Sequence, residues 1–353
     1  MSTQNKLRVA VIGCGMFATS QYLPNISREA DAETVAAVDI DFGRAETAAR
    51  RFGIPNAYHD VYELVQKCDF DVAIDAASIQ AHDEINQAVL SAGKHLISQK
   101  PAAPDVERLN EQIRLAEENH VKFACAPIHP MRYDLNFAKR LIADGAIGRA
   151  YYLKCNMSHG GPEYEPGAGA LVDMGVHGLQ IVTSLFGPAS SVACTAIIST
   201  PRREIRSGAY NGRYIDSDKL PDQYLITLKF PNERMALVDS GFSQKASRAP
   251  QLEIFGDRGT IAFTKPYMTN PKPDVYIDSG ELGLRGWVTP DEWGEPPRRL
   301  TSQCCILRDL ADAVAADTTP LLSAYHARHV LEIMCKIPDA IQTGREQRLE
   351  TVF

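Results

Sequence analysis

The sequence predicts an α/β protein with a doubly wound parallel sheet in its N-terminal domain and an open, largely antiparallel sheet in a C-terminal α+β domain. Short apolar runs alternate with helical segments as far as Pro127, which is typical of βαβ units. Strand-like runs dominate after one long helix, which favours an antiparallel sheet. Because 353 residues exceed the roughly 100–200 of one domain, we expect two domains, residues 1–127 and 128–353.

The expected elements of the first domain follow one another in regular order. Five runs rich in apolar and β-branched residues are the expected strands: residues 7–13, 33–39, 71–78, 94–98 and 121–127. The segments between them that read as helices are residues 17–30, 43–53, 82–93 and 103–120. Right-handed crossovers between these strands predict a parallel sheet covered by helices on both faces.

The second domain is expected to begin with a helix near 134–144 and a strand over 150–160, followed by a long helix over 169–187. Five strand-like runs come next: residues 191–200, 222–230, 234–242, 251–256 and 260–264. Asp257 and Arg258, between two glycines, predict a hairpin. Helices are expected over 307–317 and 324–344. The long polar and proline-rich stretches 201–221 and 265–299 predict functional loops or interface segments.

Composition and charge narrow the classes of function. The net charge is −7 and no basic block stands out, so nucleic acid is not an expected partner. The N-terminus has no charged-then-apolar leader, and no apolar run approaches the roughly 20 residues of a membrane span, so we expect a cytoplasmic protein without a membrane partner. The eight cysteines form no CxxC pair, which predicts free thiols and no metal site.

A glycine-rich turn, VIGCGMFATS, follows the first expected strand and opens a helix. In its GxGxxA pattern Gly13 permits the tight turn, Gly15 lets the backbone approach a pyrophosphate, and Ala18 keeps the helix near the sheet. Asp39 ends the second strand, where a carboxylate accepts hydrogen bonds from ribose hydroxyls and repels a 2′-phosphate. The pattern predicts binding of NAD rather than NADP. A doubly wound domain without a nucleotide is the alternative.

The expected strand over 94–98, which is the fifth strand of such a sheet, leads into Gln99-Lys100-Pro101. A residue before proline is held in extended geometry, so the backbone of Lys100 has little freedom. Ligands of open α/β sheets bind in the crevice at the carboxyl ends of the strands, which predicts that Lys100 meets the nicotinamide end of the cofactor. Taken alone, the motif favours a solvated lysine beside a turn proline.

The helix GALVDMGVHGLQ places Asp173 and His177 four residues apart, and therefore on one helical face. Histidine suits proton transfer near neutral pH. An ordinary Asp–His pair on a solvated helix is the alternative. The surroundings of the pair, GAGALVDMGVHGLQIV, are too apolar and glycine-rich for a wet surface, so we expect this helix to pack closely against another element.

The order of these motifs resembles the Gfo/Idh/MocA family, named for glucose–fructose oxidoreductase, inositol dehydrogenase and a rhizopine-catabolism protein. The resemblance covers most of the chain and is carried by VIGCGMFA, VDIDFGRAETAARRFGIP, AVLSAGKHLISQKPAA, RLIADGAIG, GALVDMGVH and LEIFGDRGTI. It implies a Rossmann domain and an α/β domain whose open sheet often forms the interface of an oligomer, here a homodimer or homotetramer.

The resemblance also implies roles for individual residues. Lys100, Asp173 and His177 match the family's catalytic lysine, aspartate and histidine. The expected cofactor contacts are Gly13, Gly15, Met16, Phe17, Asp39, Ala77, Ser78, His82, Gln99 and Lys100. Arg132 and His159 are weaker candidates for substrate contact, with a salt bridge at a helix start and a turn histidine as the alternatives. The family usually has E-K-P where this chain has Gln99-Lys100-Pro101, which leaves open how Lys100 is held.

These features predict an NAD-dependent oxidoreductase that moves a hydride between nicotinamide and a hydroxyl or keto carbon of a sugar, sugar derivative or cyclitol. Either His177 or Lys100 could be the base. Two alternatives are a redox-neutral, NAD-using hydrolase or eliminating enzyme of the same fold, and a non-catalytic NAD-binding regulator.

Overall fold

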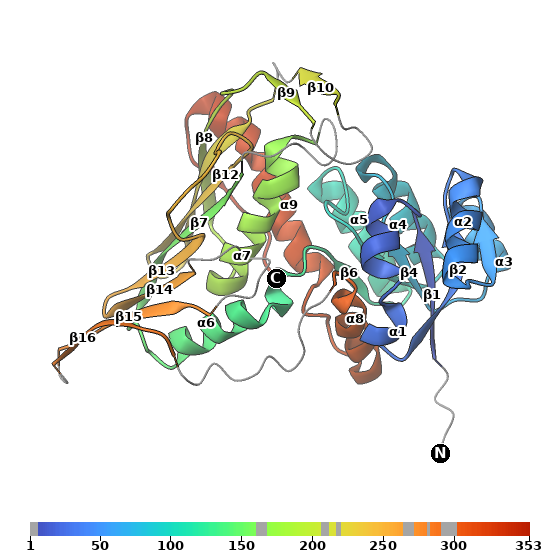
Figure 1. The fold of residues 1–353 in the computed structure, drawn as a ribbon, viewed down its shortest axis with the longest axis horizontal. Coiled ribbons are helices and arrows are strands. Elements are labelled where there is room, and N and C mark those ends of the chain that lie inside the picture. Colours follow the sequence, from blue (N-terminus) through green and yellow to red (C-terminus); the bar gives the residue numbers. More distant parts are fainter. Residues whose placement is uncertain are drawn as a thin grey trace. The chain divides into compact units, whose positions relative to one another are not determined.

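The computed structural model describes residues 6–159, 168–205, 212–216, 220–263, 272–280, 283–290 and 302–353 (Figure 1). The chain forms two compact units. Unit 1 contains Met1–Ile128 and Arg299–Arg328, and unit 2 contains His129–Arg298 and His329–Phe353. No helix in the described ranges is long and apolar enough to cross a membrane.

Unit 1 is built on a six-stranded, wholly parallel sheet in the order β3-β2-β1-β4-β5-β6. Its strands are β1 (Leu7–Ile12), β2 (Ala32–Val38), β3 (Asn56–Tyr58), β4 (Val72–Asp75), β5 (His95–Ser98) and β6 (Phe123–Cys125). The central strands are buried, β4 throughout and β1 from Val9 onward, as expected for a sheet covered on both faces. From β1 the chain adds strands first on one side, as β2 and β3, and then on the other side, as β4, β5 and β6. Because the crossovers are right-handed, the helices of the two halves lie on opposite faces of the sheet. The predicted doubly wound sheet is confirmed.

The helices of unit 1 are α1 (Ile26–Glu29), α2 (Phe42–Phe52), α3 (Val61–Lys67), α4 (His82–Ser91), α5 (Val106–Glu118) and α8 (Cys305–Ala316), with short turns η1 (Ala18–Tyr22) and η2 (Ile79–Ala81). The prediction of one continuous helix over 17–30 is wrong. Its first part is the π-helical turn η1, in which the amide of Leu23 donates to the carbonyl of Ala18. Pro24 has no amide hydrogen to continue the helix, and only the single turn α1 follows.

The division of the chain also differs from the expected one, because residues 299–328 group with unit 1. The carbonyl of Leu322 accepts a hydrogen bond from the amide of Cys125 on β6, at 2.8 Å. Arg308 on α8 pairs with Glu29 on α1, at 3.2 Å. The sequence of an amphipathic helix does not indicate which sheet the helix covers. Because α8 lies near the end of the chain, the sequence analysis assigned it to the second domain.

Unit 2 contains a nine-stranded sheet in the order β16-β15-β14-β13-β7-β12-β11-β8-β17, in which only β7 and β12 run parallel. Its strands are β7 (Ala150–Ser158), β8 (Ser191–Ile197), β11 (Gln223–Phe230), β12 (Arg234–Gly241), β13 (Leu252–Gly256), β14 (Gly259–Phe263), β15 (Asp274–Ser279), β16 (Leu284–Val288) and β17 (Gln347–Arg348). The hairpin predicted at Asp257 and Arg258 joins β13 to β14. The predicted open, mostly antiparallel sheet is confirmed.

Three helices and two short turns complete unit 2: η3 (His129–Met131), α6 (Tyr133–Ala143), η4 (Leu171–Gly175), α7 (Val176–Phe186) and α9 (Ala324–Thr343), which begins in unit 1. In β11, Tyr224, Ile226, Leu228 and Phe230 are buried and alternate with exposed residues, so one face of the sheet forms the core. Side chains of α6, α7 and α9 fill the same core. A separate antiparallel pair, β9 (Arg202–Glu204) and β10 (Tyr214–Asp216), lies in a stretch that the sequence left without elements.

Candidate active site

The glycine-rich turn of unit 1 packs against the loop that follows β4. Gly13 has a φ of +86°, and a Cβ on it would lie 2.6 Å from the amide nitrogen of Ala77. Apart from its own chain neighbours, no heavy atom of the described residues lies within 4 Å of the corresponding position on Gly15. The first glycine is therefore required by close packing, whereas the backbone at the second is open to a ligand. This arrangement fits the pyrophosphate of a dinucleotide.

Asp39 lies beside this turn, one residue past the end of β2. Its Oδ2 accepts a hydrogen bond from the amide of Cys14 at 2.8 Å, and its Oδ1 accepts one from the amide of Asp41 at 2.9 Å. The two bonds fix a carboxylate next to the turn, where the ribose of a bound dinucleotide is expected. Met16 and Phe17 are 71% and 41% exposed at the same turn. Apolar side chains left uncovered there are consistent with a cofactor that covers them.

Replacing Asp39 with asparagine should lower the affinity for NAD by roughly 10–100-fold and reduce the preference over NADP. The change keeps an oxygen acceptor but removes the charge that strengthens hydrogen bonds to ribose hydroxyls, each worth about 1.5–3 kcal/mol. Fluorescence titration with both cofactors measures the effect. Asp60→Asn is the matched control, because Asp60 caps α3 by accepting from the amide of Glu63. Equal or tighter binding of NADP by the unmodified protein would contradict the assignment of Asp39.

His82 is a buried residue that supports the loop after β4 through its contact with Asp75. It is 1% exposed, and its Nδ1 lies 2.6 Å from Oδ2 of Asp75, the last residue of β4. The other carboxylate oxygen of Asp75 accepts a hydrogen bond from the amide of Ala77 at 3.0 Å. Asp75 and His82 thus set the path of Ala77 and Ser78, and through Ala77 they support the turn at Gly13. Direct contact of His82, Ala77 or Ser78 with a cofactor stays a prediction.

Lys100 follows β5, at the same edge of the parallel sheet as Gly13 and Asp39. The neighbouring Gln99 donates its side-chain amide to the hydroxyl of Tyr22, which is fully buried on η1. Burial raises the pKa of this phenol, so Tyr22 stays neutral. Gln99 therefore ties the end of β5 to the helical turn that follows the glycine-rich loop. The side chain that follows Ser98 is thus held by a contact with a buried, neutral phenol.

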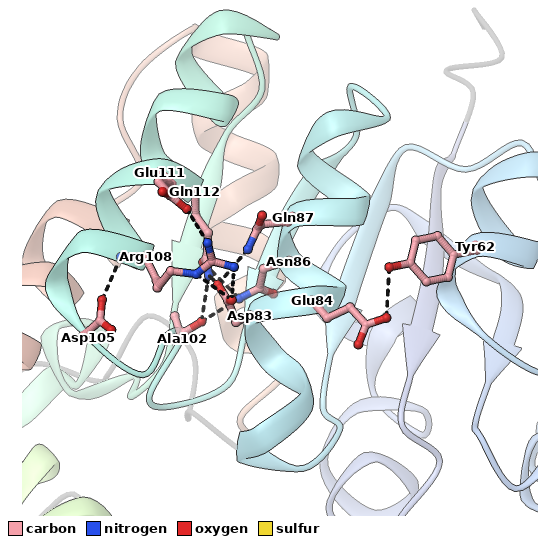
Figure 2. Close-up of polar contacts among 10 residues, drawn as sticks. All are labelled: Tyr62, Asp83, Glu84, Asn86, Gln87, Ala102, Asp105, Arg108, Glu111 and Gln112. Atoms are coloured by element: carbon pink, nitrogen blue, oxygen red, sulfur yellow. Dashed lines mark hydrogen bonds and ion pairs between the residues drawn. The ribbon is translucent and has the colours of Figure 1, made fainter.

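A buried polar network anchors the chain on both sides of Lys100, and Figure 2 shows the part of it that joins Asn86 and Gln112 to Ala102. Nδ2 of Asn86, on α4, lies 3.0 Å from Oγ of Ser98 and donates to the carbonyl of Ala102 at 2.9 Å. Nε2 of Gln112, on α5, donates to the same carbonyl at 3.3 Å and to Asp83 at 2.9 Å. Asn86, Ser98 and Gln112 are fully buried. Two helices therefore hold the segment that carries the lysine.

Replacing Asn86 with leucine should destabilise unit 1 by about 1–3 kcal/mol. Leucine fills a similar volume but removes the donor from which Oε1 of the buried Gln112 accepts at 3.2 Å, and a buried polar atom left without its partner costs about this much. Urea unfolding followed by circular dichroism gives the change in free energy. The neighbouring Gln87→Ala is the control, since Gln87 reaches Asp83 from a half-buried position and should change stability by less than about 0.5 kcal/mol. Equal effects of the two substitutions would contradict the importance of the buried network.

In unit 2, Asp173 lies on the π-helical turn η4 and His177 on the first turn of α7. A Cβ on Gly178 would lie 2.6 Å from Cγ1 of Val238 and 2.9 Å from Cγ of Met157, so α7 lies directly on β12 and β7. Asp173 is 8% exposed. The close packing predicted for this helix is therefore confirmed. A wide π turn within a helix is rare and is frequent at functional sites.

His177 is hydrogen-bonded to a second histidine that the sequence reasoning missed. Nδ1 of His177 lies 2.9 Å from Nε2 of His129, and the two rings meet edge to face with centroids 5.0 Å apart. Burial, with His177 and Arg132 nearby, holds the pKa of His129 well below its usual value, so His129 is neutral. No spacing rule connects residues 48 positions apart on different elements. The one signal in the sequence was a histidine, His129 in HPMR, just after the expected domain boundary.

The two weaker substrate candidates lie in the same unit. The guanidinium of Arg132 is buried and pairs with Asp134 through two contacts, one of them at 2.9 Å. This contact is the salt bridge at the start of a helix that the sequence analysis gave as the alternative role of Arg132. His159, just after β7, packs on Phe242, and burial lowers its pKa although the charge of Asp173 opposes the shift. His159 and Asp173 therefore interact electrostatically, whereas substrate contact by Arg132 or His159 stays a prediction.

A parallel sheet with an open glycine-rich turn, a fixed carboxylate after β2 and a lysine after β5 defines an NAD-binding oxidoreductase. Residues 7–126 match the family model for the oxidoreductase family with an NAD-binding Rossmann fold, and residues 135–262 match the GFO/IDH/MocA C-terminal domain. The chain belongs to the Gfo/Idh/MocA family, as its motifs predicted, and is an NAD(P)-dependent oxidoreductase of CH–OH groups.

Named relatives agree with this class. The chain is 28% identical to inositol 2-dehydrogenase 2 of Saccharopolyspora erythraea over 82% of its length and 86% of the relative. It is 27% identical to levoglucosan dehydrogenase of Pseudarthrobacter phenanthrenivorans over 69% and 68% of the two chains. A structure of levoglucosan dehydrogenase with NADH and L-sorbose matches 98% of this chain and 99% of its own, with a TM-score of 0.81 and 23% identity.

Proposed function

We propose that this enzyme transfers a hydride between nicotinamide and a secondary hydroxyl or keto carbon of a sugar, sugar derivative or cyclitol. Two named relatives act on such compounds, an inositol and an anhydrosugar, which supports a polyhydroxylated substrate for this chain as well. NAD supplies the hydride acceptor in the oxidative direction. The remaining chemistry, which is proton transfer and stabilisation of charge on oxygen, belongs to side chains of the protein.

The position of Lys100 relative to Asp39 carries the proposal. Asp39 follows β2 and Lys100 follows β5, and these strands flank β1 on opposite sides in the order β2-β1-β4-β5. Strands in a sheet are about 4.8 Å apart, so the two positions are separated by three spacings, or about 14 Å. A dinucleotide whose adenosine ribose meets Asp39 extends across β1 toward β5. Lys100 is then at its nicotinamide end, where the reacting carbon must lie.

Each candidate catalytic residue has one role in the proposed reaction. His177 takes the hydroxyl proton as the hydride leaves the adjoining carbon. The ammonium of Lys100 stabilises the negative charge that develops on that oxygen, which is worth several kcal/mol in a site that excludes water. Asp173 orients the substrate hydroxyl or His177. In the reverse direction His177 returns the proton to the new hydroxyl.

A substrate panel tests the proposal directly. The purified enzyme is incubated with NAD and, in turn, with inositols, anhydrosugars and free sugars, while NADH absorbance is followed at 340 nm (the wavelength at which only the reduced cofactor absorbs). We expect NADH formation with at least one polyhydroxylated compound and none with simple primary alcohols. Conversion of a glycoside without any net NADH would instead support the redox-neutral alternative.

We also propose that unit 2 forms a homodimer or homotetramer through the face of its sheet away from the core. Leu225 on β11 and Met235 on β12 are exposed on neighbouring strands of that face. A wide sheet face with exposed apolar side chains is commonly covered by another subunit. The cytoplasmic location expected from the sequence stays a prediction.

A further inference from the structure

We propose that His129 is a positioning residue of the active site: it fixes His177 in the tautomer that carries its proton on Nδ1, and so leaves Nε2 as the basic nitrogen. The inference rests on the proposed function, because it identifies the residue that prepares His177 for proton transfer. It concerns contacts within unit 2 alone.

The geometry of the pair supports this role. The 2.9 Å separation of Nε2 of His129 and Nδ1 of His177 is a good hydrogen bond between ring nitrogens. His129 comes from η3 and His177 from α7, so the bond joins two elements that the chain builds separately. The near-perpendicular rings, at 82°, keep the bond on the Nδ1 side of His177. Proton exchange with a substrate therefore falls to Nε2.

His129 is held more firmly than a typical side chain in a turn. It is 4% exposed, and its carbonyl accepts a hydrogen bond from the amide of Arg132 at 2.9 Å. The side-chain amide of Asn136, on α6, donates to the carbonyl of Pro130 at 3.1 Å. Two successive carbonyls of the turn are thus held by hydrogen bonds, and the buried imidazole has a defined position before any substrate binds.

The charge state of His129 decides what it can do. Because burial and the nearby Arg132 hold its pKa well below the usual value, His129 carries one ring proton throughout the physiological range. In the described part of unit 2, the nearby Arg132 pairs with Asp134, and the charge of Asp173 acts on His159. A neutral His129 can orient His177 but cannot take a second proton from it. It is therefore not a relay.

The proposed proton transfer is balanced within the site. In the resting enzyme, the Nδ1 hydrogen of His177 is donated to Nε2 of His129, and Nε2 of His177 has a lone pair. The substrate hydroxyl gives its proton to that lone pair while the hydride leaves the adjoining carbon. The His177 imidazolium then keeps its bond to His129, which becomes charge-assisted and stronger. His129 therefore stabilises the protonated form more than the neutral one.

Nitrogen NMR tests the tautomer without substrate or turnover. In protein with ¹⁵N-labelled histidine, above the pH at which His177 protonates, the two-bond ¹H–¹⁵N pattern distinguishes the tautomers, and His177→Gln assigns the signal. We expect the Nδ1–H tautomer in the unmodified enzyme and the more common Nε2–H tautomer in His129→Phe. The Nε2–H tautomer in the unmodified enzyme, or no change in the variant, would overturn the proposal.

Kinetics test the consequence for catalysis with the active substrate found in the panel. We expect His129→Phe to lower kcat by about 10–100-fold, with unchanged NAD affinity. The acidic limb of the kcat/KM profile should move to lower pH, because the His177 imidazolium loses its acceptor. His129→Gln, which retains a polar atom near the position of Nε2, should recover part of both effects. Unchanged kcat and an unmoved acidic limb in folded His129→Phe would overturn the proposal.

A second buried histidine separates positioning from loss of structure. His329 is fully buried in unit 2, where its Nε2 accepts from the amide of Ala189 at 2.9 Å and its Nδ1 lies 3.0 Å from the hydroxyl of Thr351. His329→Gln should lower thermal stability but leave the acidic limb unmoved. An equal shift in this variant would overturn the proposal. If no polyol supports NADH formation, the proposed function fails, while the NMR measurement still decides the tautomer.

Discussion

Replacing His177 with alanine should lower kcat by about 10²–10⁴-fold while leaving the affinity for NAD nearly unchanged. A positioned acid–base group contributes this much to the rate. The cofactor features of unit 1, namely the turn at Gly13 and the carboxylate of Asp39, do not depend on His177, because they are held by backbone contacts within unit 1. The loss should therefore appear in the chemical step and not in binding of the cofactor.

Stopped-flow measurement of the first turnover, together with titration of NAD, separates these two effects. His329→Gln serves as the control, since it alters a buried histidine of the same unit that is bonded to Ala189 and Thr351. We expect its kcat to stay within about twofold of the unmodified enzyme, as for substitutions away from the reacting atoms. A His177→Ala variant that loses cofactor binding, or that keeps full turnover, would show that His177 has a structural role only.

Much of unit 1 could be predicted because its local signals agree with one another. Gly13 is predictable because a positive φ next to a crowded backbone admits only glycine, and the turn has that requirement. The parallel order follows from short buried strands alternating with amphipathic helices. The hairpin between β13 and β14 was equally predictable from two glycines between β-rich runs. In each case the cause lies within about ten residues of the chain.

The missed features depend on contacts between distant residues. The assignment of α8 to unit 1 is set by pairs such as Arg308 with Glu29. The strands β15 and β16 lie in a proline-rich stretch whose composition favours loops, and cross-strand pairing between Tyr276 and Trp287 overrides it. The bond between His129 and His177 likewise joins two elements that are adjacent only after folding. Of the candidate site, the residue types were predictable, but their hydrogen-bond partners were not.

Replacing Lys100 with methionine should lower kcat/KM for the active polyol by about 10²–10³-fold. Methionine keeps the length of the side chain but removes the ammonium that stabilises charge on the substrate oxygen, and the loss of one such group costs about 2.7–4 kcal/mol. The fold should be preserved, since Asn86 and Gln112 hold the flanking Ala102 through its carbonyl and Gln99 bonds to Tyr22. None of these contacts uses the lysine side chain.

A lysine at the opposite end of the same strand provides the matched control for this substitution. Lys94 precedes β5, lies 3.8 Å from Oδ1 of the exposed Asp69, and is over the ring of Phe70. Surface pairs of this kind contribute about 0–1 kcal/mol, so Lys94→Met should leave kcat/KM within about twofold. Lys100→Arg, which restores the charge with a bulkier group, should recover part of the rate. If Lys100→Met retains full activity while His177→Ala does not, the ammonium has no part in catalysis, and stabilisation of the substrate oxygen must come from other groups.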